Sequence, residues 1–318
     1  MTIWNRTETA RFLLERDHYA ILTHRRPDGD TLGSAAALCR GLRMLGKTAH
    51  ILTNPDLSAR FAWLHTGLTK DAVQEGDTIV SVDVASPQLI PNIYADLLGH
   101  IALRIDHHAT ATSFTNAELV DSASASCAEV VWDVLMEMGV RPDRDLAEAV
   151  YVGLSTDTGC FRYANTTAHT FSVAAECVRA NARIYELNQD LFETNTLGRL
   201  RMQAWIVDHM WLLREGTMAV CAIPKAKELE LGVTEDDMDN ISSFPRTVAG
   251  VKMAATLRET SDGNTKLSVR AIPGLDATRV TVKFGGGGHK GAAGAFLRLP
   301  LEQAAEAVAQ AMLELDGQ

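Results

Sequence analysis

Three potential metal ligands lie within seven residues near the start of the chain. Residues 19–30 begin with four apolar side chains and then present His24, Asp28 and Asp30. Pro27 prevents a helix from continuing, and the glycine between the two aspartates permits a tight turn. We therefore expect all three ligands on one loop after a strand, where open α/β sheets bind their ligands. Taken alone, the loop is equally consistent with a polar turn in which Asp30 caps a helix.

Three later stretches also place possible ligands where an apolar segment meets a loop. They are Asp83 after residues 78–82, Asp106, His107 and His108 after residues 101–105, and Asp157 shortly after residues 149–154. Carboxylates and imidazoles are hard or borderline metal ligands. Their repeated position at the ends of apolar segments is not expected of residues that only solvate a surface. The four stretches together predict a metal centre.

These stretches resemble, in order, the four motifs of the DHH phosphoesterase family: HRRPDGD, VDVAS, RIDHHAT and STDTG. They span about half of the chain. The resemblance implies one ion held by His24, Asp28 and Asp83, and a second held by Asp30, Asp83, His107 and Asp157. Asp83 would bridge the two. Mixed imidazole and carboxylate ligands suit Mn²⁺, with Mg²⁺ or Co²⁺ as substitutes.

Two ions about 3.5–4 Å apart can activate a shared water and stabilise both the attacking and the leaving oxygen. That water is the expected nucleophile, and Asp83 is expected to be catalytic as the shared ligand. His107 and His108 are consecutive, and neighbouring side chains of an extended segment point in different directions. We therefore expect one ligand, His107, and one general acid or phosphate contact, His108. A buried structural histidine is the alternative.

A run of four glycines followed by a histidine is the second chemical signal, within residues 284–294. Because glycines have no side chains to pack, something is expected to approach their backbone closely. Phosphate is the natural candidate, since exposed N–H groups form an anion nest. Taken alone, the run is equally consistent with a flexible loop tip. The run resembles the signature of the DHH-associated C-terminal domain. The resemblance implies that substrate phosphate is bound by Gly286, Gly287, Gly288, His289 and Arg270, with Arg246 as a further candidate.

Strands and helices alternate through the first part of the chain, which predicts a mostly parallel α/β sheet wound on both faces. Strands are expected at 19–23, 48–52, 78–83 and 101–105, with helices at 7–17, 31–45, 87–98, 127–138, 145–156 and 168–180. The later part predicts a hairpin of strands 250–258 and 266–272 and a last helix over 301–315. The expected domains are a catalytic domain at 1–190, a connecting helix at 191–214 and a smaller α/β domain at 215–318.

The composition limits which binding partners and which cellular compartment are expected for the protein. The net charge of −10 argues against a protein that neutralises many phosphates of a long duplex. The five cysteines form no CxxC pair, so each is expected to be a buried thiol in a reducing cytoplasm. No window approaches ~18 uninterrupted apolar residues, and the first residues show no signal-peptide core, so no membrane partner is expected.

The two resemblances together cover nearly the whole chain and point to the bacterial nanoRNase subgroup of the family. This implies a hydrolase that degrades very short single-stranded RNA and dephosphorylates 3′,5′-adenosine bisphosphate, without acting on duplexes. The alternatives are a phosphodiesterase for linear dinucleotides, a RecJ-like single-strand exonuclease, and a non-enzymatic nucleotide-binding regulator. A non-enzymatic regulator is expected to have lost metal ligands, but all six positions that the resemblance implies carry suitable residues here. The sequence therefore disfavours the regulator. The sequence leaves the oligomeric state open, and a homodimer is compatible with it.

Overall fold

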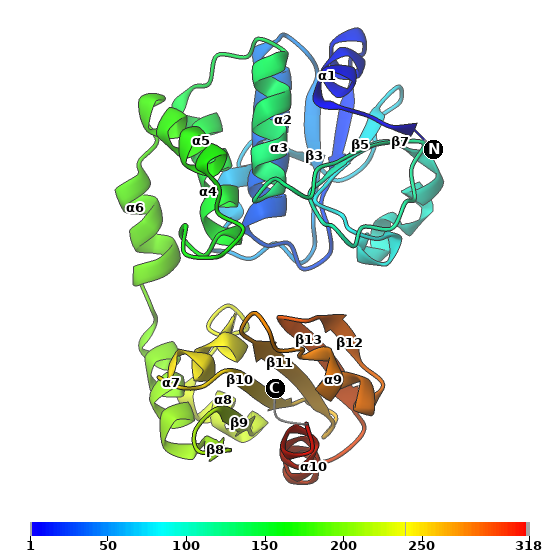
Figure 1. Ribbon diagram of the computed structural model, residues 1–318. Helices are drawn as coiled ribbons and strands as arrows, with labels where there is room; N and C mark the ends of the chain where they lie inside the picture. Colours follow the sequence, from blue (N-terminus) through cyan, green and yellow to red (C-terminus); the bar gives the residue numbers. More distant parts are fainter. Residues whose placement is uncertain (1, 239, 316–318) are drawn as a thin grey trace. The chain divides into compact units, whose positions relative to one another are not determined.

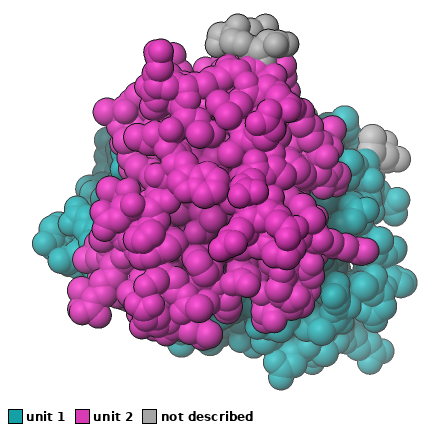
Figure 2. Space-filling model, turned by 90° about the horizontal axis from the view of Figure 1, so that it is seen from below, with its two compact units in different colours: residues 1–194 teal, residues 195–318 magenta. Residues whose placement is uncertain are grey.

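The computed structural model describes residues 2–238 and 240–315 (Figure 1). The chain divides into two compact units, residues 1–194 and 195–318, which Figure 2 distinguishes by colour. Each unit has its own sheet and its own apolar core. In the described part of the chain, no helix combines the length and the apolar character that crossing a membrane requires.

Unit 1 is built on a seven-stranded sheet whose paired strands are all parallel. In spatial order the strands are β1 (Thr2–Ile3), β7 (Ala117–Val120), β6 (Ile101–Asp106), β5 (Thr78–Val82), β2 (Tyr19–Leu22), β3 (Ala49–Leu52) and β4 (Thr69–Lys70). The chain runs from β2 outward to β3 and β4, and then returns to add β5, β6 and β7 on the other side of β2. The order therefore reverses between β2 and β5. Ligands of open α/β sheets bind beyond the carboxyl ends of the strands at such a switch point.

The two faces of this sheet are covered differently. The larger core packs against α-helices, which are α1 (Arg6–Glu15), α2 (Gly29–Met44), α3 (Cys127–Glu137), α4 (Arg144–Asp157) and α5 (Ala168–Arg179), with the short 3₁₀ helix η1 (Ala62–His65). A smaller core, which includes Leu22, Ile79 and Tyr94, lies under two 3₁₀ helices, η2 (Pro87–Leu89) and η3 (Asn92–His100). The predicted fold class is confirmed. The single α-helix predicted at 87–98 is wrong, because Pro91 lacks an N–H and divides the segment.

Glycines allow three of the helices of unit 1 to approach closely. A Cβ on Gly33 of α2 would collide with the carbonyl oxygen of Ala149 in α4. A Cβ on Gly153 of α4 would collide with Ala128 of α3 and would lie 2.7 Å from Asp30 Oδ1. The missing side chains therefore bring α2, α3 and α4 together around the Asp30 carboxylate.

The stretch of chain that follows the first unit's core and leads into the second sheet is not one helix. It contains α6 (Ile184–Asn188), a π-helical turn η4 (Gln189–Glu193) and α7 (Leu197–His209), followed by strand β8 (Trp211–Leu213). Thr194 and Thr196 are extended, and the Thr196 side chain accepts a hydrogen bond from Arg199 N to start α7. Met202 and Ile206 of α7 are buried in a cluster with Cys221 and Ile223, so α7 packs as part of unit 2.

Unit 2 contains a six-stranded mixed sheet with the order β12 (Gly287–His289), β13 (Ala292–Leu297), β11 (Thr265–Ala271), β10 (Met253–Glu259), β9 (Met218–Ile223) and β8. Only β9 and β10 pair in parallel in the described sheet. One face packs against α10 (Leu301–Leu313), and the other carries α7 and η5 (Ile241–Thr247). Shorter helices complete the unit, namely α8 (Lys225–Leu231), α9 (Thr278–Thr281) and η6 (Val282–Phe284). The predicted hairpin and last helix are confirmed.

Candidate metal centre

The first group of possible ligands joins the loop after β2 to the end of β5. His24 Nε2 lies 3.6 Å from Asp28 Oδ1 and 3.6 Å from Asp83 Oδ2. His24 Nδ1 lies 2.9 Å from the carbonyl oxygen of Arg25. Because that contact requires a proton on Nδ1, Nε2 is the nitrogen that can bind a cation. The residue that caps α2 is Asp28, which accepts hydrogen bonds from the amides of Asp30 and Thr31, so the suggested capping role of Asp30 is wrong.

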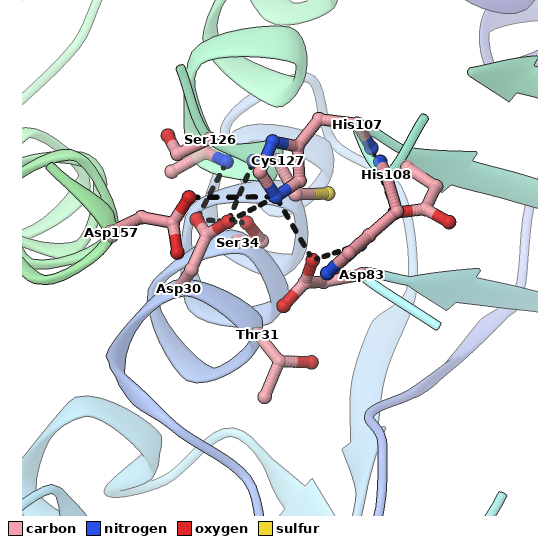
Figure 3. Close-up of polar contacts among 12 residues, drawn as sticks. Asp30, Thr31, Ser34, Asp83, His107, His108, Ser126, Cys127 and Asp157 are labelled. Carbon is pink, nitrogen blue, oxygen red and sulfur yellow. Dashed lines mark hydrogen bonds and ion pairs between the residues drawn. The ribbon is translucent and has the colours of Figure 1, made fainter. Parts of the chain in front are cut away.

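The second group joins α2, the residues after β6 and the end of α4 (Figure 3). His107 Nε2 lies 3.7 Å from Asp30 Oδ2 and 3.5 Å from Asp157 Oδ2. The amides of Cys127 and Ala128, at the start of α3, donate to the two oxygens of Asp30 at 2.7 and 2.9 Å. These amides and the α3 dipole favour a negative charge on Asp30, but burial prevails and raises the pKa of its carboxyl.

Asp83 faces the first group through one carboxylate oxygen, and through the other it faces His107 of the second group together with His108. Its Oδ2 faces His24, whereas Oδ1 lies 3.7 Å from His107 Nε2 and 3.5 Å from His108 Nδ1. Oδ1 is buried and has no hydrogen-bond partner among the described residues, which is costly for a carboxylate. Separations of 3.5–3.7 Å are too long for hydrogen bonds but suit atoms that share a cation about 2.1 Å away. The residues therefore fit two divalent cations with Asp83 between them.

The electrostatics of the cluster also favour cations. Burial, together with the charge of Asp30, raises the pKa of Asp83 well above its ordinary value. Burial and the neighbouring Asp30 and Asp28 raise the pKa of Asp157 to about 8. Burial opposes a charge on His24, but its contacts with Asp28 and Asp83 prevail and raise its pKa to about 11. Bound protons thus offset the crowded negative charge, and divalent cations would take their place.

We expect cation binding to release protons and to strengthen as the pH rises from about 6 to 8. Asp157, with a pKa of about 8, is protonated over most of this range and must lose its proton to become a ligand. Calorimetric titration of Mn²⁺ in buffers with different ionisation enthalpies measures this release. Asp157→Asn is the control, because it removes one titrating carboxyl and should reduce the number of protons released. Identical heats in every buffer would contradict the expectation.

His107 and His108 both reach the same carboxylate, so the expected divergence of their side chains is wrong. Their rings are 4.6 Å apart, and each has a nitrogen within 3.7 Å of Asp83 Oδ1. Strand alternation does not apply, because β6 ends at Asp106, whose Oδ1 accepts hydrogen bonds from the amides of both histidines. The same oxygen lies 2.8 Å from His108 Nδ1 and fixes that ring. Sequence reasoning counted Asp106 among the possible ligands but assigned it to neither metal site, and its place directly before two histidines was the signal for this orienting role.

The candidates in unit 2 lie on one face of its sheet. Arg270 of β11 and His289 of β12 are both paired with Ala292 of β13. Residues directly opposite one another in antiparallel strands share a face, so the Arg270 and His289 side chains are on the same side. It is the face opposite α10, because Val269 and Ala271 belong to the α10 core. Arg246 lies in η5, which packs on this same face.

Two of the four glycines have a structural explanation that the sequence did not reveal. A Cβ on Gly286 would collide with Gly294 and Ala295, and one on Gly288 would lie 2.6 Å from Ala293 Cα. The close approach expected at these two glycines is therefore made by strand β13, and the contact of their backbone with phosphate stays a prediction. A Cβ on Gly287 would meet no atom within 4 Å, so the outer side of this residue is open.

An all-parallel sheet with carboxylates and imidazoles gathered at its switch point is the arrangement of an α/β protein whose residues fit divalent cations. The model of the DHH family N-terminal domain matches residues 18–154, and that of the DHHA1 domain matches residues 216–315. The chain belongs to the DHH family. These matches confirm the resemblance found in the motifs.

Curated relatives match along most of the chain. It is 33% identical to the bifunctional oligoribonuclease and PAP phosphatase NrnA of Thermus thermophilus, over 92% of this chain and 89% of that protein. It is 26% identical to the Bacillus subtilis protein of the same name, over 91% and 92% of the two chains. The crystal structure of an exopolyphosphatase-related protein from Bacteroides fragilis has the same fold, with a TM-score of 0.88 at 22% identity, covering 97% and 96%.

Proposed function

We propose that the protein is a phosphoester hydrolase that uses two divalent cations, Mn²⁺ in first place, with Mg²⁺ or Co²⁺ as substitutes. The observation that carries the proposal is the division of Asp83, whose two oxygens face two separate groups of ligands. His24 and Asp28 would complete one site, and Asp30, His107 and Asp157 the other. Oxygen and imidazole donors suit Mn²⁺, and the described residues of both groups include no thiolate.

When bound, the two cations supply Lewis acidity to the scissile phosphate. The protein's own residues orient the histidine side chains and transfer protons. Asp106 holds His108 through Nδ1 at 2.8 Å, and the His108 side chain is 36% exposed. Its Nε2 has no hydrogen-bond partner among the described residues and can donate a proton to the leaving oxygen. The carbonyl oxygens of Arg25 and Ser124 orient His24 and His107 in the same way, through Nδ1.

The proposed substrates are RNAs of a few nucleotides and 3′,5′-adenosine bisphosphate. The relatives from Thermus thermophilus and Bacillus subtilis carry both activities in their names, and each aligns over about nine tenths of this chain. In unit 2 the phosphate contacts would come from Arg270, His289 and the backbone of Gly286, Gly287 and Gly288, with Arg246 as a further contact. The shared face of Arg270 and His289 supports this assignment. Linear dinucleotides are included in the same substrate class.

We expect catalytic efficiency with Mn²⁺ to be highest on RNAs of about two to five nucleotides and to be negligible on duplexes. The net charge of −10 gives additional backbone phosphates little attraction. Only a few phosphates should be contacted, so affinity should depend weakly on salt, with a slope of about −0.7 per contacted phosphate.

The measurement is turnover of a length series of 2- to 24-nucleotide RNAs and of adenosine bisphosphate, at two ionic strengths. Faster degradation of the 24-nucleotide strand than of a trinucleotide would favour a RecJ-like exonuclease. Binding of these ligands without turnover would favour the regulator.

A further inference from the structure

The loop that follows Asp157 is held in an unusual and tightly bonded conformation. Gly159, Cys160 and Phe161 are consecutive residues with φ of 57°, 58° and 61°. Left-handed backbone is uncommon for residues other than glycine and is costly for a bulky one. Such strain persists only where the surroundings impose it, and it clusters at functional sites.

Hydrogen bonds fix this loop directly against the metal centre. The amides of Arg162 and Tyr163 both donate to the carbonyl oxygen of Thr158, each at 3.0 Å, one residue beyond Asp157. The Asn165 side chain donates to the carbonyl oxygens of Ala125 and Asp157 at 2.9 and 3.2 Å. Phe161 is anchored in a stack with Phe171 at 5.5 Å. The loop is therefore a rigid support rather than a flexible connection.

The support directs a cationic side chain outward. Arg162 Nε donates to the carbonyl oxygen of Gly159 at 2.5 Å, which fixes the plane of the guanidinium. Arg162 is exposed, and no carboxylate in the described part of the chain forms an ion pair with it. In a chain with 40 acidic and 30 basic residues, a fixed arginine without such a partner, five residues after the proposed ligand Asp157, is suited to an anion. Phosphate is the anion whose geometry a guanidinium matches.

The neighbouring tyrosine presents an aromatic surface. A Cβ on Gly159 would lie 2.6 Å from Tyr163 Cε1, so the tyrosine ring rests on the glycine backbone. The side chain is nevertheless 46% exposed, and its hydroxyl makes no hydrogen bond to the residues that the structure describes. An exposed ring that is supported from behind is what stacking on a nucleobase requires.

We propose that Arg162 and Tyr163 form a nucleotide-recognition subsite in unit 1. Tyr163 stacks on the nucleobase nearest the cleaved bond, and Arg162 binds a phosphate other than the one being cleaved. The inference rests on the proposed function, since it supplies the base and second-phosphate contacts of the same reaction. It also explains why Gly159 is needed, because a side chain there would displace the tyrosine ring.

The test is a calorimetric measurement of how two non-hydrolysable ligands bind to the Mn²⁺-loaded protein. In each ligand, phosphonates replace the 3′- and 5′-phosphates of a ribose. One is the analogue of 3′,5′-adenosine bisphosphate, and the other has the same ribose ring without a base. Tyr163→Ala should weaken binding of the adenosine analogue about 5- to 150-fold and leave the base-free analogue unchanged. Tyr163→Phe should bind as the wild type does, because stacking needs no hydroxyl. Arg162→Ala should weaken both analogues, by about 10-fold or more.

Matched controls lie on the same unit. Tyr185→Ala removes a tyrosine that is 69% exposed on α6, and Arg179→Ala removes an exposed arginine of α5. Both should bind the two analogues as the wild type does. Equal weakening of both analogues by Tyr163→Ala, or no weakening of either, would overturn the stacking role.

Measuring turnover of adenosine bisphosphate alongside binding shows whether a negative result overturns the subsite or the proposed function on which it rests. A wild type that turns the substrate over while Tyr163→Ala and Arg162→Ala bind normally overturns the subsite alone. A wild type that shows the predicted base-dependent binding without turnover overturns the proposed function and supports the subsite. A wild type that binds neither analogue overturns both.

Discussion

Replacing Asp83 by asparagine is expected to lower turnover by at least about 10³-fold, a loss of roughly 4 kcal/mol of transition-state stabilisation. Asp83 is the one described side chain whose two oxygens face both ligand groups. An amide keeps the shape of the carboxylate but loses its charge and one of its two metal-binding oxygens. Both cations should therefore bind more weakly. The measurements are Mn²⁺ content by elemental analysis and turnover of adenosine bisphosphate.

Asparagine is preferred to alanine here because Asp83 has a φ of 58° and its amide donates to Ile105 O at 2.9 Å. Asparagine adopts left-handed backbone more readily than alanine, so Asp83→Asn tests the ligand without adding backbone strain. Asp157→Asn is the comparison, since Asp157 contacts only the second group and should lose chiefly one cation. Two retained cations and most of the activity in Asp83→Asn would refute the shared-ligand assignment.

Replacing Arg104 by methionine is expected to lower the free energy of unfolding by about 3–5 kcal/mol, the usual cost of breaking a buried ion pair from one side. Arg104 is the largest fully buried side chain of the described core, and its Nη2 lies 2.9 Å from Glu118 Oε2. Its Nη1 donates to the carbonyl oxygen of Thr112 at 3.0 Å. Methionine fills part of the volume but leaves the buried Glu118 without its cation. Urea unfolding followed by fluorescence measures the change.

A double-mutant cycle separates the ion pair from packing. Glu118→Gln alone should also destabilise the protein, because it leaves Arg104 without its charged partner. The double variant Arg104→Met with Glu118→Gln should be less destabilised than the sum of the two, by at least about 1 kcal/mol. Strict additivity would show that the pair contributes nothing beyond its packing. The effect should extend to the metal centre, since Arg104 lies 3.8 Å from Asp106.

Several elements could be predicted because their signals are local. Strand β2 is a continuous apolar run, as expected of a strand buried on both faces, and all four of its residues are buried. Ser126 followed three residues later by Glu129 is a local pattern of a helix start, and the Ser126 hydroxyl caps α3 by accepting from Glu129 N at 3.1 Å. The short edge strands β1 and β4 were missed, since two residues carry no periodicity. The η3 segment was assigned to the wrong kind of helix, because hydrophobic spacing hardly separates 3₁₀ from α geometry over nine residues.

The sequence by itself determined which residues meet at the candidate metal centre. His24, Asp83 and His107 follow parallel strands, whose carboxyl ends lie at one edge of the sheet, and the resemblance to the four DHH motifs supplied the set of ligands. Only the tertiary structure decided how they meet. The contact of Asp30 with the start of α3 joins residues 97 positions apart, and it exists because Gly33 and Gly153 let three helices converge. Likewise, β13 rather than a ligand accounts for Gly286 and Gly288, because no local pattern encodes which distant strand will lie against a glycine.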